Sequence, residues 1–254
     1  MNLLRERIKE GQLLKGALVS LTDPCLCEIM GNVGFDCVFI DTEHTYMSYK
    51  DVLCHLNAAR SSGIASLVRV PQNDLTATKK ILEMGPDGIL FPMVKSQEEF
   101  NELMNMTLYP PLGTRGFGPM RAIDYCSDKS LEYVQTKQHD LCRYVQIETI
   151  ELINDLEKIA VNPYIDGFIF GPNDLSGSCG ELLNVFGEAT VTQIKRAIEI
   201  LKRHKKSVGF ACGFKDDEVR FWYSLGFDMI FSGGDWTYIY NQATTTLKLL
   251  NSLK

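Results

Sequence analysis

Short runs of apolar and β-branched residues alternate with longer segments of helical period along the whole chain. Runs of this kind predict strands, and the amphipathic segments between them predict helices. The alternation repeats eight times without a linker or a shift in composition. The predicted strands are residues 16–21, 36–41, 65–70, 88–94, 143–148, 166–171, 207–212 and 228–232.

The number of strand-helix units favours one (β/α)8 barrel of the TIM type over a doubly wound sheet. A length of 254 residues is usual for such a barrel, so we expect residues 1–254 to form a single domain. Ser96 and Glu99 have the spacing of a capping box, and Gly63, Gly85 and Gly226 are expected to end helices. The clearest predicted helices are residues 73–84, 96–108, 188–204 and 215–225.

Composition excludes several classes of function. The chain is 45% hydrophobic and 23% charged, which is typical of a globular protein, and its net charge of −6 argues against binding to nucleic acid. No apolar window reaches the 18 or so residues that a membrane span needs. Eight cysteines are dilute in this length and predict buried, reduced thiols. The N-terminus does not resemble a signal peptide, so we expect a cytoplasmic protein.

In a barrel of this kind, chemistry is expected where the strands end, at their carboxyl ends. Polar residues stand at the ends of four of the predicted strands or just after them, and a strand buried in a core does not need polar residues there. A long connection, residues 109–126 (YPPLGTRGFGPMRAIDYC), is a further candidate for a functional loop. The polar strand-end residues are Asp41, Glu43, His44, Arg69, Gln146, Glu148, Asn173 and Asp174.

Glu148 and Asp174 form a pair of hard oxygen ligands that suits Mg²⁺ or Mn²⁺ better than zinc. Two protein ligands would leave coordination positions for water and a chelating substrate. Alternatively, Glu148 caps the following helix and Asp174 closes a turn. Arg69 could hold a carboxylate or stabilise an enolate, or it could pair with Glu43 or another acid at the mouth. His44 is the only one of four histidines at a strand end, and it is the candidate general base.

Two other chemistries have weaker support. Gly233 and Gly234 could offer backbone amides to a phosphate, but Asp235 would place a negative charge at that helix start. Lys95 could form a Schiff base with a carbonyl substrate, although a surface lysine at the start of a helix is the more ordinary interpretation.

Six motifs, in order and spacing, resemble the metal-dependent pyruvate aldolases of the HpcH/HpaI family, which belong to the phosphoenolpyruvate/pyruvate superfamily of barrels. The resemblance runs from about Gly16 to the C-terminal helix. It implies a (β/α)8 barrel, in agreement with the strand count. The motifs are DTEH, LVRVPQND, ILEMGPDGILFPMV, YPPLGTRGFGP, VQIET and IFGPNDLSG.

The resemblance also implies roles for individual residues. It makes Glu148 and Asp174 the ligands of a divalent cation (Mg²⁺, Mn²⁺ or Co²⁺), Arg69 the residue that faces the carbonyl oxygen of pyruvate, and His44 the catalytic base. In the family an aspartate in LLDxG pairs with this histidine, whereas the present chain has Glu83 in ILEMG. Glu83 is thus either the implied catalytic partner of His44 or a helix-end residue. The remaining implied residues are Gly171, Asn173 and Asp174 for the pyruvate carboxylate, and Asp41 and Glu43 for waters around the metal.

The implied activity is a retro-aldol cleavage of a 4-hydroxy-2-oxo acid to pyruvate and an aldehyde, through an enolate stabilised by the metal and Arg69. A citryl-CoA-lyase-like or decarboxylating lyase of the same superfamily, and a noncatalytic binding protein on a barrel scaffold, are the alternatives. The resemblance further implies a homo-oligomer, a hexamer built as a trimer of dimers. In it the C-terminal helix (235–254) would be exchanged between subunits, and residues 116–118 would close a neighbour's site.

Overall fold

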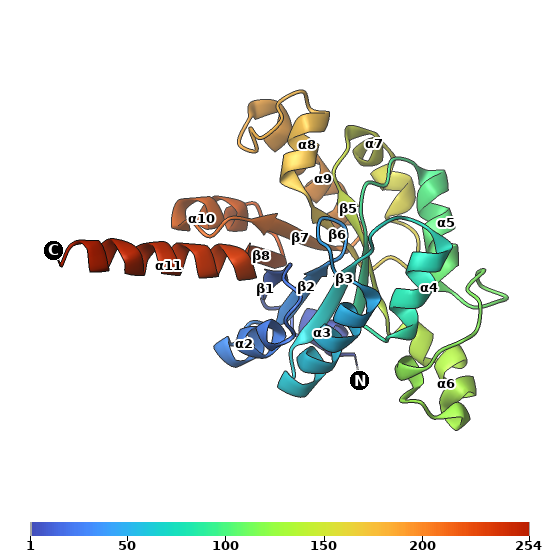
Figure 1. The fold of residues 1–254 in the computed structure, drawn as a ribbon. Coiled ribbons are helices and arrows are strands. Elements are labelled where there is room, and N and C mark those ends of the chain that lie inside the picture. The colour runs from blue at the N-terminus through green and yellow to red at the C-terminus, as the bar shows by residue number, and fades with distance from the viewer. Residues whose placement is uncertain (1, 254) are drawn as a thin grey trace.

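Eight parallel strands close into a barrel in the order in which they occur along the chain, as Figure 1 shows. The computed structural model describes residues 2–253. Both the predicted (β/α)8 barrel and the predicted number of strands are confirmed. The strands are β1 (Leu14–Val19), β2 (Cys37–Asp41), β3 (Ala65–Arg69), β4 (Gly88–Phe91), β5 (Cys142–Ile147), β6 (Gly167–Phe170), β7 (Ser207–Cys212) and β8 (Met229–Gly234).

The fourth strand is shorter than predicted, because it ends at Phe91 rather than at residue 94. Pro92 has no N–H to donate to a neighbouring strand. Met93 then takes a positive φ of 51°, which no strand residue adopts. The chain therefore leaves the sheet at Pro92.

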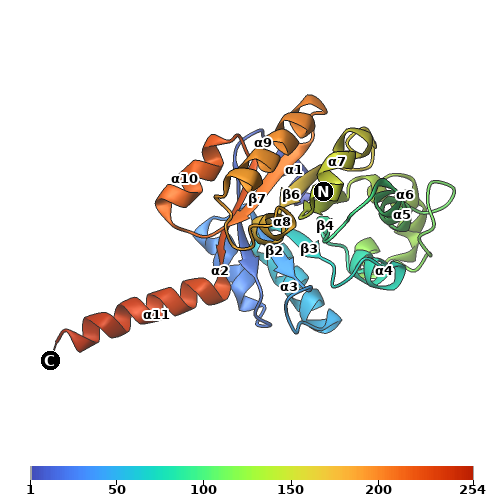
Figure 2. The same ribbon diagram turned by 90° about the horizontal axis from the view of Figure 1, so that it is seen from above.

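Helices surround the strands and connect each one to the next (Figure 2). The connection between β4 and β5 also contains one short α-helix and three 3-10 turns, which fall in and just after the long loop predicted at residues 109–126. The helices are α1 (Leu3–Lys9), α2 (Cys25–Val33), α3 (Tyr49–Ser62), α4 (Leu75–Glu83), α5 (Gln97–Thr107), α6 (Ser130–Gln135), α7 (Ile150–Ile159), α8 (Pro172–Ser178), α9 (Glu188–Arg203), α10 (Asp216–Ser224) and α11 (Asp235–Asn251), and the 3-10 turns are η1 (Arg121–Ile123), η2 (Ser127–Lys129) and η3 (Lys137–His139).

The predicted helix ends follow local hydrogen bonding. Gly63, Gly85 and Gly226 all have positive φ angles after helices, as a left-handed helix end requires. The Ser96 hydroxyl accepts from the Glu99 amide at 3.2 Å, so the predicted cap of α5 is present. The Glu99 carboxylate, however, accepts from the Lys95 amide at 2.9 Å, which is one residue before the partner that a capping box would give it.

Side chains from the strands fill the barrel interior. Phe39, Leu67, Tyr144 and Phe231 are all at most 1% exposed there, and Leu4 of α1 closes the amino end of the barrel. Burial of each large apolar side chain stabilises the fold by about 1.5–3 kcal/mol. Gly16 is needed for this packing, since a Cβ at that position would lie 2.2 Å from Cδ1 of Phe231. The interior is thus a packed core that supports a site at its carboxyl end.

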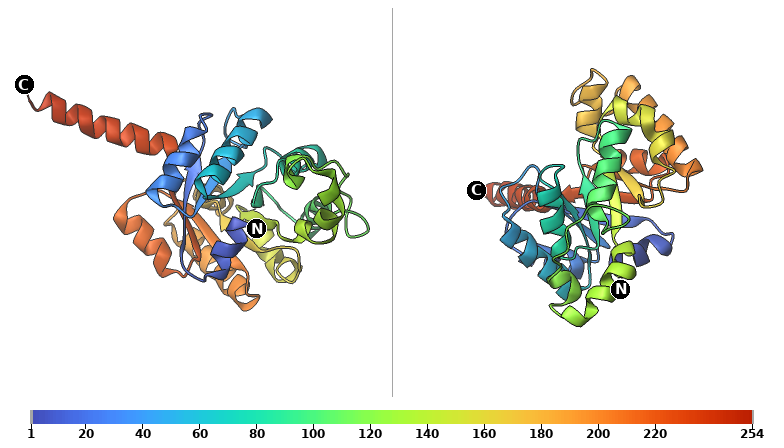
Figure 3. Two further views of the ribbon diagram at one scale, coloured as in Figure 1. Left: turned by 90° about the horizontal axis from the view of Figure 1, so that it is seen from below. Right: turned by 90° about the vertical axis from the view of Figure 1, so that its right-hand side faces the viewer.

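The last helix, α11, projects away from the barrel in Figures 1 and 2 and in the left view of Figure 3. Only its beginning packs on the barrel, where Tyr238 lies against Phe35 and Phe214. Further along, Tyr240 is 67% exposed and Leu250 is 55% exposed. In the described range 2–253, no helix has both the length and the apolar character for crossing a membrane.

The cysteines agree with the predicted burial only in part, because Cys25 is exposed and four others are partly exposed. All eight have free thiols, and Cys27, Cys37 and Cys142 are buried. Burial raises the pKa of the Cys27 thiol to about 12, so this thiol is protonated at neutral pH. These cysteines pack as small apolar side chains.

Candidate active site

Arg69 lies at the centre of the candidate site and is the last residue of β3. Its neighbour in the strand register is Asp41, the last residue of β2. Arg69 Nε lies 2.9 Å from Asp41 Oδ1, and Arg69 Nη2 lies 2.7 Å from Asp41 Oδ2. This two-point contact fixes the plane of the guanidinium. Both side chains are buried, so solvent screens their interaction only weakly.

The third nitrogen of Arg69 connects two further residues. Nη1 lies 3.0 Å from Glu43 Oε2 and donates to Gln146 Oε1 at 3.3 Å. The guanidinium also lies over the Phe39 ring, 5.3 Å from its centre. Arg69 therefore makes the ion pair with Glu43 that the sequence left open as an alternative, and one cation holds the ends of β2, β3 and β5 together.

Gln146 is a strand-end residue for which the sequence predicts no role. It is 4% exposed and accepts a hydrogen bond from Arg69. The available signal was its spacing from Glu148, because residues two apart in a strand point to the same side of the sheet. The spacing accounts for the predicted place of Gln146 at the mouth, whereas its hydrogen bond with Arg69 is seen only in the structure.

The segment after β2 is organised by Asp41. Asp41 Oδ1 accepts hydrogen bonds from the amides of Glu43 at 3.0 Å and His44 at 3.4 Å, and the Asp41 carbonyl accepts from the Thr45 hydroxyl. Burial alone would raise the pKa of Asp41, but the hydrogen bonds and the charge of Arg69, together with these amides, hold it below its ordinary value. Asp41 is thus an ionised anchor for both Arg69 and the turn that carries His44.

Glu148 follows β5 and is 2% exposed. Its Oε2 accepts a hydrogen bond from the Met93 amide at 2.7 Å. The pKa of Glu148 is raised to about 7, mainly by burial. The hydrogen bond from Met93 lowers this pKa, whereas the charges of Glu43 and Asp174 contribute to the rise. Glu148 does not cap α7, because the Thr149 side chain accepts from Leu152 at that helix start. That alternative for Glu148 is wrong.

Gly171, the residue after β6, packs directly on this carboxylate. A Cβ at Gly171 would lie 2.6 Å from both Glu148 Oε1 and Gln146 Nε2. Only glycine therefore lets the β6 end approach the two side chains of β5. This contact explains why the turn into α8 begins with glycine.

Asp174 and Asn173 lie in the first turn of α8, and both are exposed. The charge of Asp174 raises the pKa values of both Glu43 and Glu148, which indicates that the three carboxylates share one region of the mouth. Backbone N–H groups in the first turn of a helix have no acceptor within the helix. The turn can therefore present amides to a substrate carboxylate.

His44 lies at the rim of the mouth. Its Nε2 is 3.7 Å from Glu43 Oε2, and the side chain is 65% exposed. The ring can therefore reach a substrate without rearrangement of the core. Among the other histidines, His55 is buried, and its ring contacts the Cys27 thiol and the Leu21 carbonyl, so it has a structural role.

Glu83 does not meet His44 within one chain. It ends α4, which leads to the amino end of β4, whereas His44 follows the carboxyl end of β2. The Glu83 carboxylate instead lies against Gly118 in the long loop, where a Cβ would be 3.1 Å from Glu83 Oε1. The structure of one chain therefore does not bring Glu83 and His44 together.

The structure gives little support to a phosphate site at Gly234 or to a Schiff base on Lys95. The Asp235 carboxylate accepts from the amides of Ser20 and Leu21, both at 2.8 Å, and so places a buried negative charge beside Gly234. This charge disfavours a phosphate at that helix start. Lys95 lies beyond the end of β4 and is exposed, as expected for a surface lysine.

The donor set suits a divalent cation with incomplete protein coordination. Within residues 2–253, no group of three His, Cys, Asp or Glu side chains is already arranged around a common point. Glu148 and Asp174 can supply two oxygens, and the buried Glu43 Oε2 receives no hydrogen bond of good geometry. Crowded carboxylates raise one another's pKa, and a cation would favour their ionised forms. These residues therefore fit Mg²⁺ or Mn²⁺.

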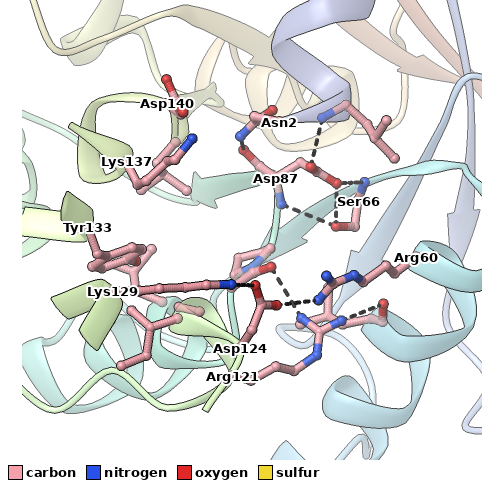
Figure 4. Close-up of a pocket in the computed structure, with 18 of the residues that line it drawn as sticks. Asn2, Arg60, Ser66, Asp87, Arg121, Asp124, Lys129, Tyr133, Lys137 and Asp140 are labelled. Carbon is pink, nitrogen blue, oxygen red and sulfur yellow. Dashed lines mark hydrogen bonds and ion pairs between the residues drawn. The ribbon is translucent and has the colours of Figure 1, made fainter. Parts of the chain in front are cut away.

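A separate cavity of about 430 Å³ opens at the opposite, amino end of the barrel (Figure 4). Its charged side chains are largely paired: Asp124 lies 2.9 Å from Arg60 and 2.7 Å from Lys129. Hydrogen bonds from Lys129 and then Arg60 hold the pKa of Asp124 at about 2. Arg121 is occupied by Asn57 and by backbone carbonyls. The cavity is thus distinct from the site at the mouth.

Comparison with known proteins identifies the family of this chain. Residues 16–213 match the family model described as HpcH/HpaI aldolase/citrate lyase. A hydroxypyruvate/pyruvate aldolase of Deinococcus radiodurans is 31% identical over 96% of this chain and 88% of its own length. A 4-hydroxy-2-oxo-heptane-1,7-dioate aldolase of Shigella sonnei is 31% identical over 82% of this chain and 79% of its own length.

A solved structure of the same family has the same fold. The HpcH/HpaI aldolase/citrate lyase family protein of Burkholderia cenocepacia J2315 superposes with a TM-score of 0.92 at 25% identity, over 99% of this chain and 100% of its own. The predicted resemblance and the predicted enzyme class, a carbon–carbon lyase of the aldolase type, are both confirmed. This chain belongs to the HpcH/HpaI aldolase/citrate lyase family.

Proposed function

We propose that this aldolase cleaves a 4-hydroxy-2-oxo acid to pyruvate and an aldehyde, and that Glu148 and Asp174 hold the divalent cation on which aldolases of this family generally depend. One observation carries the proposal: Arg69, its acidic partners and both candidate ligands gather at the carboxyl end of one barrel. The cation, when bound, supplies positive charge beside the substrate carboxylate and the 2-oxo group.

The pyruvate half of the substrate lies between α8 and Arg69 in this proposal. Amides in the first turn of α8, at Asn173 and Asp174, receive the carboxylate. Arg69 donates a hydrogen bond to the 2-oxo oxygen, which gains negative charge as the C3–C4 bond breaks. Because Asp41 already holds two of its nitrogens, the guanidinium needs little reorganisation during the reaction.

His44 removes the proton of the 4-hydroxyl group. This removal allows the C3–C4 electrons to move into the pyruvate fragment, so that the aldehyde leaves and an enolate remains. Protonation of the enolate at C3 then yields pyruvate. Glu43, 3.7 Å from the imidazole, is the nearest acid in the same chain and would favour the protonated histidine after this transfer.

We further propose that the enzyme acts as a homo-oligomer with sites at subunit boundaries. Glu83 and the long loop lie together at the amino end of the barrel, and Phe117 and Met120 of that loop are 61% and 63% exposed. A second chain could bring this surface to the mouth that carries His44. The projecting α11 offers a second apolar surface for a partner. We propose that this homo-oligomer is a hexamer, built as a trimer of dimers.

The experiment is a synthesis screen in which pyruvate is combined with a panel of aldehydes, with and without Mn²⁺. Metal-dependent formation of 4-hydroxy-2-oxo acids supports the proposal. Borohydride trapping of pyruvate on Lys95, together with activity that persists in a chelator, would favour the Schiff-base alternative and contradict it.

A further inference from the structure

The turn between β4 and α5 contains an uncommon backbone conformation next to the candidate metal ligand. Met93 has a φ of 51°, a left-handed value that side chains other than glycine rarely adopt. In this conformation the Met93 amide points at Glu148 and donates to Oε2 at 2.7 Å. Strained backbone persists where the surrounding structure holds it, and it concentrates at functional sites.

Side chains from two neighbouring connections fix this turn on either side of Met93. Asn73, which precedes α4, donates from Nδ2 to the Pro92 carbonyl at 2.6 Å and lies 3.3 Å from Glu99 Oε1. Thr149, which caps the start of α7, donates to the Val94 carbonyl at 3.4 Å. The residues before and after Met93 are therefore both held from outside the turn.

The hydrogen bond from Met93 decides which carboxylate oxygen remains available. Oε2 of Glu148 accepts the amide, while Oε1 lies on the side of Gly171 and Gln146. A carboxylate fixed through one oxygen presents the other in one orientation, and partners of this kind tune metal affinity. We infer that Asn73 and Met93 are positioning residues that orient Glu148 as a metal ligand.

The inference rests on the proposed function, and it makes a specific claim about residues that touch neither substrate nor metal. Asn73 acts on the Pro92 carbonyl, and Met93 acts through its backbone. The effect should therefore appear as altered metal affinity in a protein that is still folded. Loss of Asn73 should not act as a general packing defect, because its side chain is partly exposed.

The test is calorimetric titration of the metal-free enzyme with Mn²⁺, together with thermal melting followed by circular dichroism. Asn73→Ala and Asn73→Asp both remove the donor to Pro92, and each should raise the Kd for Mn²⁺ by about tenfold. Asn101→Ala is the matched control, because Asn101 is exposed on α5, and its Kd should equal that of the wild type.

Met93 provides a second pair of variants that leaves Asn73 intact, in case the Asn73 variants fail to fold. Met93→Gly retains the amide and adopts positive φ freely, so it should keep the wild-type Kd and melt at a higher temperature. Met93→Val places a β-branched residue at this φ, so it should weaken Mn²⁺ binding as Asn73→Ala does.

Glu148→Gln separates this inference from the proposed function. If Glu148→Gln abolishes Mn²⁺ binding while folded Asn73→Ala and Met93→Val keep the wild-type Kd, the positioning role is wrong and the metal site stands. If Glu148→Gln binds Mn²⁺ as the wild type does, the metal assignment itself is wrong, and the positioning role falls with it.

Discussion

Arg69 and Asp41 face each other at the ends of β3 and β2 and are joined by a hydrogen bond of 2.9 Å and a second ion-pair contact of 2.7 Å. A lysine could not reproduce this fork, because its ammonium offers a single point of charge. The contact turns Arg69 so that its remaining nitrogen lies near Glu43 and Gln146. The cation proposed to stabilise the enolate is thus held in place by a buried acid before substrate binds.

Substitution of Arg69 should damage both binding and rate. The same cation meets the ground-state carbonyl and the enolate, so Arg69→Ala should raise KM for the 2-oxo acid and lower kcat by about 10²–10³-fold. Arg69→Lys retains the charge but loses the fork, and it should recover only part of kcat. Steady-state kinetics of the wild type, Arg69→Ala and Arg69→Lys measure KM and kcat. Wild-type kcat in Arg69→Ala would remove Arg69 from the mechanism.

His44→Ala should lower turnover by about two to four orders of magnitude, as expected when a positioned general base is lost. Mn²⁺ affinity should be nearly unchanged, because the histidine lies at the rim and is not one of the proposed ligands. Pyruvate release and calorimetric titration of the same preparation test both statements. Near-normal kinetics in the variant would return His44 to a surface role.

The pH dependence of stability follows from Glu148. Its pKa is raised from an ordinary 4.5 to about 7, first by burial and then by nearby acids. The folded chain therefore binds the proton more tightly than the unfolded chain. The resulting stabilisation is fully present below pH 4.5 and is lost as the pH rises through about 7.

Urea unfolding of the metal-free protein between pH 5 and 8 measures this effect. The free energy of unfolding should decrease with pH over this interval in the wild type, and the decrease should be smaller in Glu148→Gln, which does not titrate. Identical pH profiles for the two proteins would show that Glu148 has an ordinary pKa.

Shared sites predict complementation between inactive subunits. His44→Ala and Glu83→Gln should each lower activity, and mixed oligomers should regain part of it, because some boundaries then contain both native residues. Truncation after Gly234 removes α11 and should abolish assembly, which light scattering measures. A fully active monomer, or no recovered activity where subunits demonstrably exchange, would contradict sites at subunit boundaries.

The sequence predicted the barrel well because strand and helix periods are local properties. It also brought Asp41, Glu43, Arg69 and Glu148 to one mouth, since strand ends of a parallel barrel meet there. It did not predict that Arg69 would bind Asp41 more closely than Glu43, because that choice depends on the register of β2 against β3.

The early end of β4 and the positive φ of Met93 also escaped prediction. Pro92 is present in the sequence and is compatible with the end of a strand. The left-handed turn at Met93, however, depends on contacts with Asn73 and Thr149 from other connections. Glu83 shows a further limit of prediction from one sequence. Its motif predicts a role beside His44, but the barrel topology places Glu83 at the end of the barrel opposite to His44. The cytoplasmic location stays a prediction.

The most direct test is pyruvate release from a 4-hydroxy-2-oxo acid by chelator-treated enzyme, before and after Mn²⁺ is added back. The wild type should lose its activity in the chelator and recover it with Mn²⁺, whereas Glu148→Gln and Asp174→Asn should recover little or none. Undiminished turnover by the chelated wild type, or full recovery in both variants, would contradict a catalytic cation held by Glu148 and Asp174.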